Sequence, residues 1–435
     1  MSTPSICRPF DTGRPWWPTL MPWSRDSGLE GISSPARQIG TTTHHLYDVG
    51  MMERLQLLQR LERVMEETEF GWSLLMVGED QSRKLADLTN DLKRPYSTTG
   101  DGKQILSGYS YWGIEPAIAW RHACHDPYYP VGKDGIDSFA QRWNDLRPAL
   151  AGAKYHYVSL GPGTGDKDRT VLQTMQPSYP EMLYVPVDIS AEMLRMCLQP
   201  TRDLPFIKTF RRQVLPVQLD FSDDENLDEL QALRDRLMGD EPILWGLLGN
   251  TAANFEDDFE LIERLASLLR PQDLLMLEVA TTSELAPDVP ERSSTEYLRS
   301  RAFCEFVTSA LHQHTDLSIN MDYVDISGEI MEPRSVMIKV IYHHRDKDTR
   351  VTLPDRTVIT LRRDDTIRLH LTRKYATANL QDELRSIGLG VKETADTTWA
   401  VRGKPYRFGL QLLLLAKGGD TGSGRSAARD LFRNG

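Results

Sequence analysis

The stretch YVSLGPGTGDKD (residues 157–168) decides how this chain folds. An apolar run rich in β-forming residues ends there in alternating glycines, just before a helical pattern begins. Gly161, Gly163 and Gly165 let the backbone approach a ligand closely, where a Cβ atom would collide with it. An ordinary tight turn also uses glycines, so the segments that follow this loop decide between the two interpretations.

Three later segments repeat the pattern of an apolar run that ends in polar residues. LYVPVDIS ends near Asp188, an acid that suits a ribose diol. VLPVQLDF ends on Asp220 and Phe221, which suit the amine and the ring of an adenine. PILWGLLGNTAANF (residues 242–255) is a fourth buried-strand pattern, with small and polar residues at its end. Because ligands of open α/β sheets gather at the carboxyl ends of the strands, the four ends together predict a nucleoside pocket.

The order of these strand ends looks like the core of the class I S-adenosylmethionine-dependent methyltransferases. We therefore expect an α/β fold: a class I methyltransferase Rossmann-like sheet with an inserted α+β second lobe and an N-terminal helical extension. The expected cofactor is S-adenosyl-L-methionine. The glycine spacing departs from the GxGxxG of nicotinamide-dependent enzymes, and the sequence contains no GxxxxGK[ST] phosphate loop, so a dinucleotide or nucleoside triphosphate is a weaker interpretation.

Composition narrows the class of partner. The 435 residues include 62 acids and 51 bases, for a net charge of −11, which argues against a phosphate-binding face and so against methylation of DNA or RNA. We expect a small-molecule acceptor, no nucleic acid and no membrane, since no apolar run approaches the length of a membrane span. The four cysteines have no metal-motif spacing, so we expect no metal site and a reducing, cytoplasmic location.

The pattern along the chain predicts its organisation. Strand and helix patterns alternate through the predicted core, which indicates a parallel sheet with right-handed crossovers. Strand-like alternation without such helices follows it, and a helix with closing strands returns at the end. The expected parts are an irregular N-terminal segment (1–45), an N-terminal helical part of the second, substrate lobe (46–135), the methyltransferase core (136–284), an inserted α+β substrate lobe (285–375), a return to the sheet (376–417) and a mobile tail (418–435).

The chain resembles the ergothioneine-pathway histidine-specific methyltransferases and their relatives, which methylate the α-amino group of amino acids. The glycine loop, VPVDIS, LDF and GNTAANF occur in the order of that family. YSYWG (109–113) stands where the family has YFYD before a glycine-containing turn, and DPYYP (126–130) stands where it has EYYP. The separation of Tyr111 from Tyr128 equals that of the corresponding tyrosines. The resemblance covers roughly residues 105 to 417.

This resemblance implies a cofactor-binding role for five residues: Gly161, Gly163, Asp188, Asp220 and Phe221. It implies that Asn254, with Gly249 beside it, contacts the α-carboxylate and α-amine of the acceptor. A side-chain amide can donate to the first and accept from the second. The alternative for Asn254 is a helix N-cap, a role that asparagine fills well.

Tyrosines complete the expected site. Tyr111 is the candidate for positioning the amine, or for accepting its proton with the help of water, and it joins Asn254 as a catalytic candidate. Tyr128 is expected to line the pocket, and Tyr297 to match a carboxylate-binding tyrosine. Each of the three also fits a structural role in the core or at an interface.

One segment departs from the family. The histidine-selective enzymes of that family bind the imidazole of their substrate with a glutamate and a serine two residues apart. In this chain, the segment RLHLTRKY puts His370 and Thr372 at those places. A neutral imidazole and a hydroxyl offer different chemistry from a carboxylate. We therefore expect the part of the site that binds the α-amine and α-carboxylate to be preserved, and the part that binds the acceptor's side chain to be changed. The alternative is that His370 is simply a buried strand residue.

The leading prediction is an S-adenosylmethionine-dependent N-methyltransferase that acts on the α-amino group of an amino acid or an amino-acid-derived small molecule other than histidine, as a divergent member of the family. The alternatives are an O- or C-methyltransferase of another small metabolite in a biosynthetic pathway, and a non-catalytic methyltransferase-fold partner subunit. The sequence leaves the acceptor, the number of methyl groups, the oligomeric state and the role of the N-terminal extension open.

Overall fold

The computed structural model describes residues 75–76, 81–94, 102–206 and 213–418. The expected irregular segment 1–45, the residues 46–74 of the expected helical part and all but the first residue of the expected tail lie outside the described residues.

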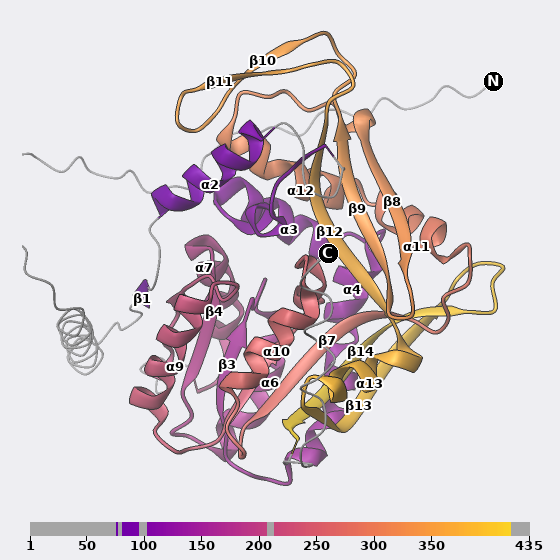
Figure 1. Cartoon of the computed structure of the whole chain (residues 1–435). Coiled ribbons are helices and arrows are strands. Elements are labelled where there is room, and N and C mark those ends of the chain that lie inside the picture. Colours follow the sequence, from indigo (N-terminus) through magenta and orange to yellow (C-terminus); the bar gives the residue numbers. More distant parts are fainter. Residues whose placement is uncertain (1–74, 77–80, 95–101, 207–212, 419–435) are drawn as a thin grey trace, which may run out of the picture. The chain divides into compact units, whose positions relative to one another are not determined.

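A sheet of mostly parallel strands forms the centre of the fold (Figure 1). Its parallel part has the order β1-β5-β4-β3-β6-β7. The strands are β1 (Leu75–Met76), β3 (His156–Leu160), β4 (Tyr184–Asp188), β5 (Val217–Gln218), β6 (Ile243–Leu247) and β7 (Leu274–Thr282). Every residue of β3, β4 and β6 is buried, as expected of strands that helices cover on both faces. This parallel-rich α/β sheet confirms the predicted fold class.

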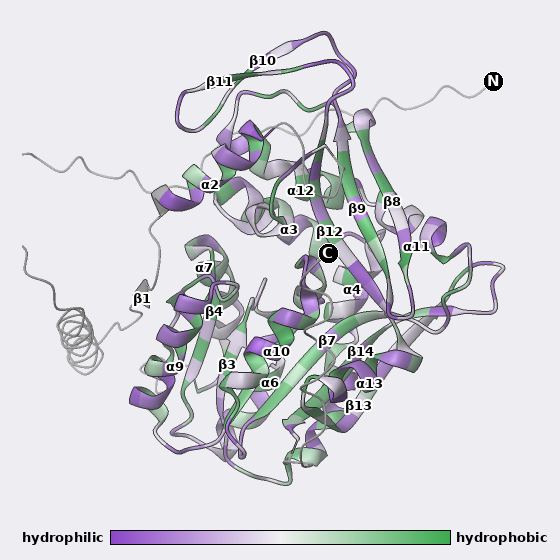
Figure 2. Ribbon diagram, in the orientation of Figure 1, coloured by the Kyte–Doolittle hydropathy of each residue, from purple (hydrophilic) through white to green (hydrophobic). Residues whose placement is uncertain are grey.

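Helices connect the parallel strands and flank the sheet (Figure 1). They are α6 (Asp166–Met175), α7 (Ala191–Leu198), α9 (Asp224–Met238) and α10 (Asp258–Leu268), with the short 3₁₀ helices η3 (Gln176–Ser178), η4 (Pro200–Asp203) and η6 (Thr251–Asn254) between them. Two of the helices begin at side-chain caps, because Ser190 accepts a hydrogen bond from the Met193 amide and Asp223 accepts one from the Glu225 amide. Figure 2 shows the hydrophobic residues concentrated in the strands and the hydrophilic residues on the helices.

Antiparallel strands extend the sheet beyond β7. The elements are α13 (Thr377–Ser386), β13 (Leu389–Ala400) and β14 (Arg407–Lys417). β14 pairs antiparallel with β7 along its length, and β13 pairs with β14. Two helices, α4 (Pro130–Asp137) and α5 (Phe139–Leu146), precede β3 and contact these strands, and the short η2 (Arg147–Leu150) follows α5.

A second group of elements is inserted after β7. It contains α11 (Val289–Leu298), α12 (Arg301–His314), η7 (Met321–Tyr323), β8 (Val324–Met331), β9 (Ser335–His343), β12 (Thr366–Ala376) and the hairpin of β10 (Thr349–Thr352) and β11 (Val358–Leu361). The earlier elements α2 (Gln81–Lys93), β2 (Lys103–Gln104), η1 (Ser107–Tyr111) and α3 (Ile114–His125) join this group, since β2 pairs with β12 and α3 packs on α12.

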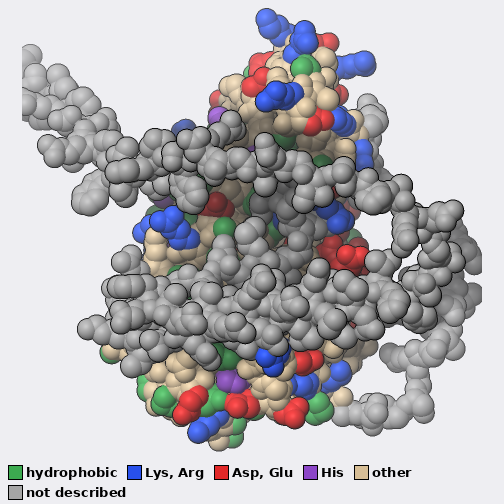
Figure 3. Space-filling view, turned by 90° about the vertical axis from the view of Figure 1, so that its left-hand side faces the viewer, with side chains coloured by type: hydrophobic (Ala, Val, Ile, Leu, Met, Phe, Trp, Pro, Cys, Tyr) green, Lys and Arg blue, Asp and Glu red, His purple; other side chains and the backbone are tan. Residues whose placement is uncertain are grey.

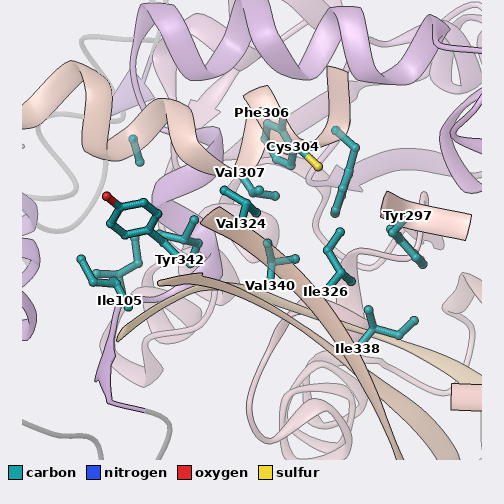
Figure 4. Close-up of a cluster of buried hydrophobic side chains, with 14 of the residues drawn as sticks. Ile105, Tyr297, Cys304, Phe306, Val307, Val324, Ile326, Ile338, Val340 and Tyr342 are labelled. Carbon is teal, nitrogen blue, oxygen red and sulfur yellow. The ribbon is translucent and has the colours of Figure 1, made fainter. Parts of the chain in front are cut away.

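The inserted group has its own hydrophobic core (Figure 4). Phe306 and Val307 of α12 lie over Val324 of β8 and over Ile338 and Val340 of β9, and all five are buried. β12 runs antiparallel to β9 and meets β7 through only two residue pairs, Tyr375 with Thr281 and Ala376 with Thr282. The strands of both groups therefore belong to one continuous sheet.

Charged side chains of both signs are intermingled around the β10–β11 hairpin at the top of Figure 3. Arg350, Arg356 and Arg362 lie near Asp355 and Asp364 in the sequence of this hairpin. The surface there therefore carries both positive and negative side chains rather than charges of one sign.

Candidate active site

A cavity of about 380 Å³ opens at the carboxyl ends of β3, β4 and β6. Its walls come from the glycine loop, from the segments that follow β4, β5 and β6, from α2, η1 and α3 of the inserted group, and from α4. All five residues that were predicted to hold the cofactor line this cavity: Gly161, Gly163, Asp188, Asp220 and Phe221. Its size is that of a typical small-molecule site.

The glycine loop has a backbone that only glycine adopts easily. The φ angles of Gly161, Gly163 and Gly165 are +64°, +60° and +80°. A Cβ atom on Gly165 would lie 2.1 Å from the carbonyl oxygen of Cys197 at the end of α7, and one on Gly161 would lie 3.1 Å from the side chain of Thr251. The loop is therefore packed against backbone on one side and leaves its own backbone facing the cavity on the other.

A buried carboxylate fixes the start of the helix that follows this loop. Asp168 accepts hydrogen bonds from the hydroxyls of Tyr157 (2.8 Å), Ser159 (3.0 Å) and Tyr184 (2.5 Å). Burial raises the pKa of Asp168 to about 6, although these three bonds favour the charged form. The cluster joins α6 to β3 and β4, so the position of the glycine loop is tied to the two strands beneath it.

Asp188, the last residue of β4, presents its carboxylate to the cavity. Its Oδ1 accepts a hydrogen bond from the backbone N–H of Ser190 at 2.9 Å. Burial raises the pKa of Asp188 to about 7, against the lowering effect of that bond. A buried acid at a strand end is well suited to accept hydrogen bonds from a pair of ribose hydroxyls.

Asp220 and Phe221 form the next part of the wall, after β5. Oδ1 of Asp220 accepts from the backbone N–H (3.0 Å) and the hydroxyl (2.6 Å) of Ser222, while Oδ2 lies 3.1 Å from Nζ of Lys84 on α2. The ring of Phe221 lies 6.0 Å from that of Phe255. Sequence reasoning missed Lys84, because α2 reaches this wall only through tertiary packing.

The predicted catalytic pair lies together in the cavity wall. Nδ2 of Asn254 donates a hydrogen bond to the hydroxyl of Tyr111 at 3.0 Å. Burial raises the pKa of Tyr111 above its usual value of 10, so this hydroxyl stays protonated at neutral pH. The alternative role of Asn254 as a helix cap is wrong, since α10 begins at Asp258 with Asp257 as its N-cap.

Gly249 lies in the same wall with a φ of +76°. Its N–H donates to Oε2 of Glu278 at 2.8 Å. Glu278 is fully buried and also pairs with Arg142, at 2.7 Å, and with Lys167. Burial opposes ionisation of Glu278, but the charges of Lys167 and Arg142 prevail and lower its pKa below the usual value.

Lys167 itself lines the cavity and was not predicted. A signal for it exists in the sequence: a lysine stands in the first turn of α6, where the helix dipole favours acids over bases. A lysine at a position that favours acids indicates that a negatively charged group lies nearby. In the structure, Glu278 is such a group.

The prediction for Tyr128 is wrong by one position. Tyr128 is 64% exposed, whereas Tyr129 is 6% exposed and lines the cavity. Tyr129 is the residue before α4, which begins at Pro130, and its ring packs against Phe303 at 5.0 Å. The turn into α4 directs the second tyrosine inward and the first outward.

His370 and Thr372 also need correction, because neither is among the residues that line the described cavity. Both are buried in β12, and η1, which does line the cavity, is joined to this strand by a hydrogen bond from the Leu371 N–H to the Ser107 hydroxyl (3.0 Å). Thr372 accepts a hydrogen bond from Asn250 at 3.1 Å. Tyr297 likewise lies in the core rather than in the cavity wall, with its ring 5.6 Å from that of Tyr129.

The surroundings of His370 are aromatic. The rings of Tyr111, Phe303 and Phe306 lie 6.3, 6.0 and 5.9 Å from its imidazole. Burial and the nearby Arg368 lower the pKa of His370 to about 3, so its side chain is neutral. Its Nδ1 is buried and has no hydrogen-bond partner among the described residues.

Comparison with known proteins identifies the chain. A family model described as "Histidine-specific methyltransferase, SAM-dependent" matches residues 109–401. The protein is therefore a methyltransferase that uses S-adenosyl-L-methionine as its cofactor. It belongs to the histidine-specific methyltransferase family, as the sequence resemblance predicted. None of the curated proteins matches the chain.

Several solved structures are similar to this one. A S-adenosylmethionine-dependent methyltransferase from Clostridium acetobutylicum is 14% identical, with 64% of this chain and 92% of the other covered and a TM-score of 0.30. Magnesium protoporphyrin IX methyltransferase from Synechocystis is 13% identical, with 70% and 96% covered and a TM-score of 0.33. The 1,6-didemethyltoxoflavin-N1-methyltransferase from Burkholderia thailandensis is 10% identical, with 70% and 88% covered and a TM-score of 0.31.

The residues present fit the family's cofactor. The glycine loop provides a stretch of backbone without side chains, Asp188 provides a buried acceptor, and Phe221 provides an aromatic wall. Within the described part of the chain, no helix is both long and apolar enough to cross a membrane.

Proposed function

We propose that this enzyme is an N-methyltransferase of the α-amino group of an amino acid, or of an amino-acid-derived small molecule, other than histidine. The observation that carries this proposal is the hydrogen bond between Asn254 and Tyr111 in the wall of the cavity. A side-chain amide and a phenol hydroxyl side by side supply both donors and acceptors, which suits a free α-amine and α-carboxylate.

The cofactor residues have separate proposed roles. Asp188 accepts from the ribose hydroxyls, Asp220 accepts from the adenine amine, and Phe221 packs on the adenine ring. S-adenosyl-L-methionine supplies an electrophilic methyl group on a sulfonium when it is bound. Gly161 and Gly163, which have no side chains, would hold the cofactor against the backbone of the loop after β3.

Tyr111 positions the amine rather than removing its proton directly. Because burial raises the pKa of Tyr111, its hydroxyl is a poor base at neutral pH and acts as a hydrogen-bond partner. The proton of the amine then leaves through water. Holding the nucleophile in line with the methyl group is the main contribution, and such positioning is worth up to about 7–11 kcal/mol in well-oriented reactions.

The cavity also supports an acceptor other than histidine. The wall near Tyr111 is mainly apolar and includes Trp120, Cys124, Tyr129 and Val131. The strand positions at which the family's histidine-selective enzymes contact an imidazole hold His370 and Thr372 here, and these are buried and do not line the cavity. We therefore propose an acceptor with an apolar side chain, bound between the core (136–284 with 376–417) and a substrate lobe (46–135 with 285–375).

A mass-spectrometric screen tests this function. The enzyme is incubated with S-adenosyl-L-methionine and each of the twenty amino acids or a cell extract, and products with one, two or three added methyl groups are sought. We expect an N-methylated amino acid or amino-acid derivative, and its loss in the Asn254→Ala variant. Asn144→Ala, at an exposed position of α5, is the matched control and should keep full activity. A product methylated only on oxygen or carbon, or full turnover by Asn254→Ala, would contradict the proposal.

A further inference from the structure

Trp120 of α3 carries a buried polar atom that the described protein does not satisfy. Its Nε1 is inaccessible to solvent and has no hydrogen-bond partner among the described residues, and Trp120 lines the cavity. An indole N–H can only donate, and a buried donor without a partner costs free energy. A ligand that brings an acceptor to this point removes that cost.

The ring of Trp120 is held in one orientation by its aromatic neighbours. Its centroid lies 5.1 Å from that of Tyr111 in an edge-on contact and 4.9 Å from that of Phe306. Tyr129 packs edge-on at 6.4 Å. These contacts keep the N–H directed toward the glycine loop, because a Cβ atom on Gly163 would lie 3.3 Å from Nε1.

The order of the strands indicates which part of the cofactor lies there. β5, β4 and β3 are consecutive neighbours in the sheet. With the adenine at Asp220 after β5 and the ribose at Asp188 after β4, the next position along the sheet is the loop after β3. The methionine portion of the cofactor would therefore extend over Gly163, where Trp120 and Lys167 also line the cavity.

The chemistry of this position favours an anion. The indole N–H is a donor only and has no partner among the described residues, and the ten-residue helix α6 begins beside the loop at Asp166. Lys167 adds a positive charge, which it shares with the buried Glu278. We infer that the indole N–H of Trp120 donates a hydrogen bond to the α-carboxylate of the methionine portion of S-adenosyl-L-methionine. This inference rests on the proposed placement of adenine and ribose at Asp220 and Asp188, and it does not depend on the identity of the acceptor.

Two nucleosides, one with and one without the amino-carboxypropyl chain that bears the carboxylate, test this role. Calorimetry measures the affinity of the protein for S-adenosylhomocysteine, which has the carboxylate, and for 5′-methylthioadenosine, which lacks it. Trp120→Phe removes the N–H and keeps a ring in the aromatic cluster. We expect about a tenfold or greater loss of affinity for S-adenosylhomocysteine and an unchanged affinity for 5′-methylthioadenosine, as for loss of a hydrogen bond to a charged group. Trp112→Phe is the matched control, since Trp112 is buried in the same lobe without lining the cavity and should change neither affinity.

A second measurement does not depend on the folding of the variant. In the unsubstituted protein, the Nε1–H resonance of Trp120 should move downfield when S-adenosylhomocysteine is added and much less when 5′-methylthioadenosine is added. An equal loss for both nucleosides, or no loss for either, overturns the inference. An unchanged affinity for S-adenosylhomocysteine with a raised KM for the acceptor also overturns it, and would assign the indole to the acceptor instead. Neither measurement requires turnover. The inference on Trp120 can therefore be wrong while the proposed function is right, and the proposed function can be wrong while the inference is right.

Discussion

Asn254 and Tyr111 are 143 residues apart in the sequence and are joined by a hydrogen bond of 3.0 Å in the wall of the cavity. Asn254 ends η6, which follows the parallel strand β6, whereas Tyr111 ends η1 in the group of elements packed on β12. The bond thus connects the sheet that carries the cofactor loop to the elements proposed to bind the acceptor. A change at either residue is expected to act on the acceptor rather than on the cofactor.

Replacement of Tyr111 by phenylalanine should lower kcat/KM for the acceptor roughly tenfold to a hundredfold. The hydroxyl is lost, and the Asn254 amide keeps neither its partner nor its orientation. Calorimetry with S-adenosyl-L-methionine should show a nearly unchanged Kd. Tyr128→Phe is the control, because Tyr128 is exposed, and it should behave like the unsubstituted enzyme. Equal activity of the two variants would remove Tyr111 from the site.

Replacement of Asp188 by alanine should weaken cofactor binding roughly tenfold to a hundredfold, since a charge-assisted pairing with the ribose hydroxyls is lost. Titration calorimetry on the folded variant measures this change. Asp220→Ala should have a smaller effect, about fivefold, because the adenine keeps its contact with Phe221 and the carboxylate of Asp220 is already paired with Lys84. A larger loss for Asp220→Ala than for Asp188→Ala would contradict the proposed division of roles.

Cofactor affinity should depend on pH through Asp188, whose pKa burial raises to about 7. The ionised carboxylate is the better acceptor, so the Kd for S-adenosyl-L-methionine should rise as the pH falls from about 8 to 6.

The same group affects the stability of the protein. The folded protein keeps on Asp188 a proton that the unfolded chain releases above its ordinary pKa, so this group's contribution to stability falls as the pH rises from about 4 to 7. Asp188→Asn should flatten the affinity profile and stabilise the protein more at pH 8 than at pH 4. An unaltered pH profile in that variant would show that another group titrates.

The double replacement His370→Glu, Thr372→Ser should not create activity on histidine. The family's pattern suggests that these two strand positions read the acceptor, but neither residue lines the cavity, and a carboxylate at position 370, among Phe303, Phe306 and Tyr111, would be poorly solvated. We expect a loss of roughly 1–3 kcal/mol in the free energy of unfolding, measured by denaturant titration, with an unaltered acceptor profile. New turnover of histidine by a stable double variant would show that β12 contributes to the acceptor pocket.

Local patterns were sufficient for the sheet and for bringing the five proposed cofactor residues to one cavity. Each residue predicted to hold the cofactor stands at the end of a buried strand, so its place follows from the strand pattern and from the rule that parallel strands end at one edge. Trp120 and Lys84 belong to helices whose own patterns give no hint of a ligand. They reach the cavity through packing between elements far apart in the sequence, and no local pattern could reveal them.

The errors on the acceptor side have similar physical causes. Two adjacent tyrosines precede α4, and only the direction of the turn at Tyr129 shows which of them points inward. In β12, residues 367–376 are all buried, so alternation along the strand does not separate a cavity face from a core face. The packing of η1 against His370, through the ring of Tyr111, joins segments far apart in the sequence, so the pattern of the strand does not predict it.

The contact of Gly165 with the carbonyl of Cys197 bears on the rate at which the cofactor binds. Backbone atoms cannot rotate aside as a side chain does, so we expect the turn to hold the same shape with and without a ligand. Binding then includes no step in which the loop must become ordered, and the entropy of that step is not lost. The association rate constant should therefore be governed by diffusion into the cavity and should vary little among nucleosides that share the same adenosine.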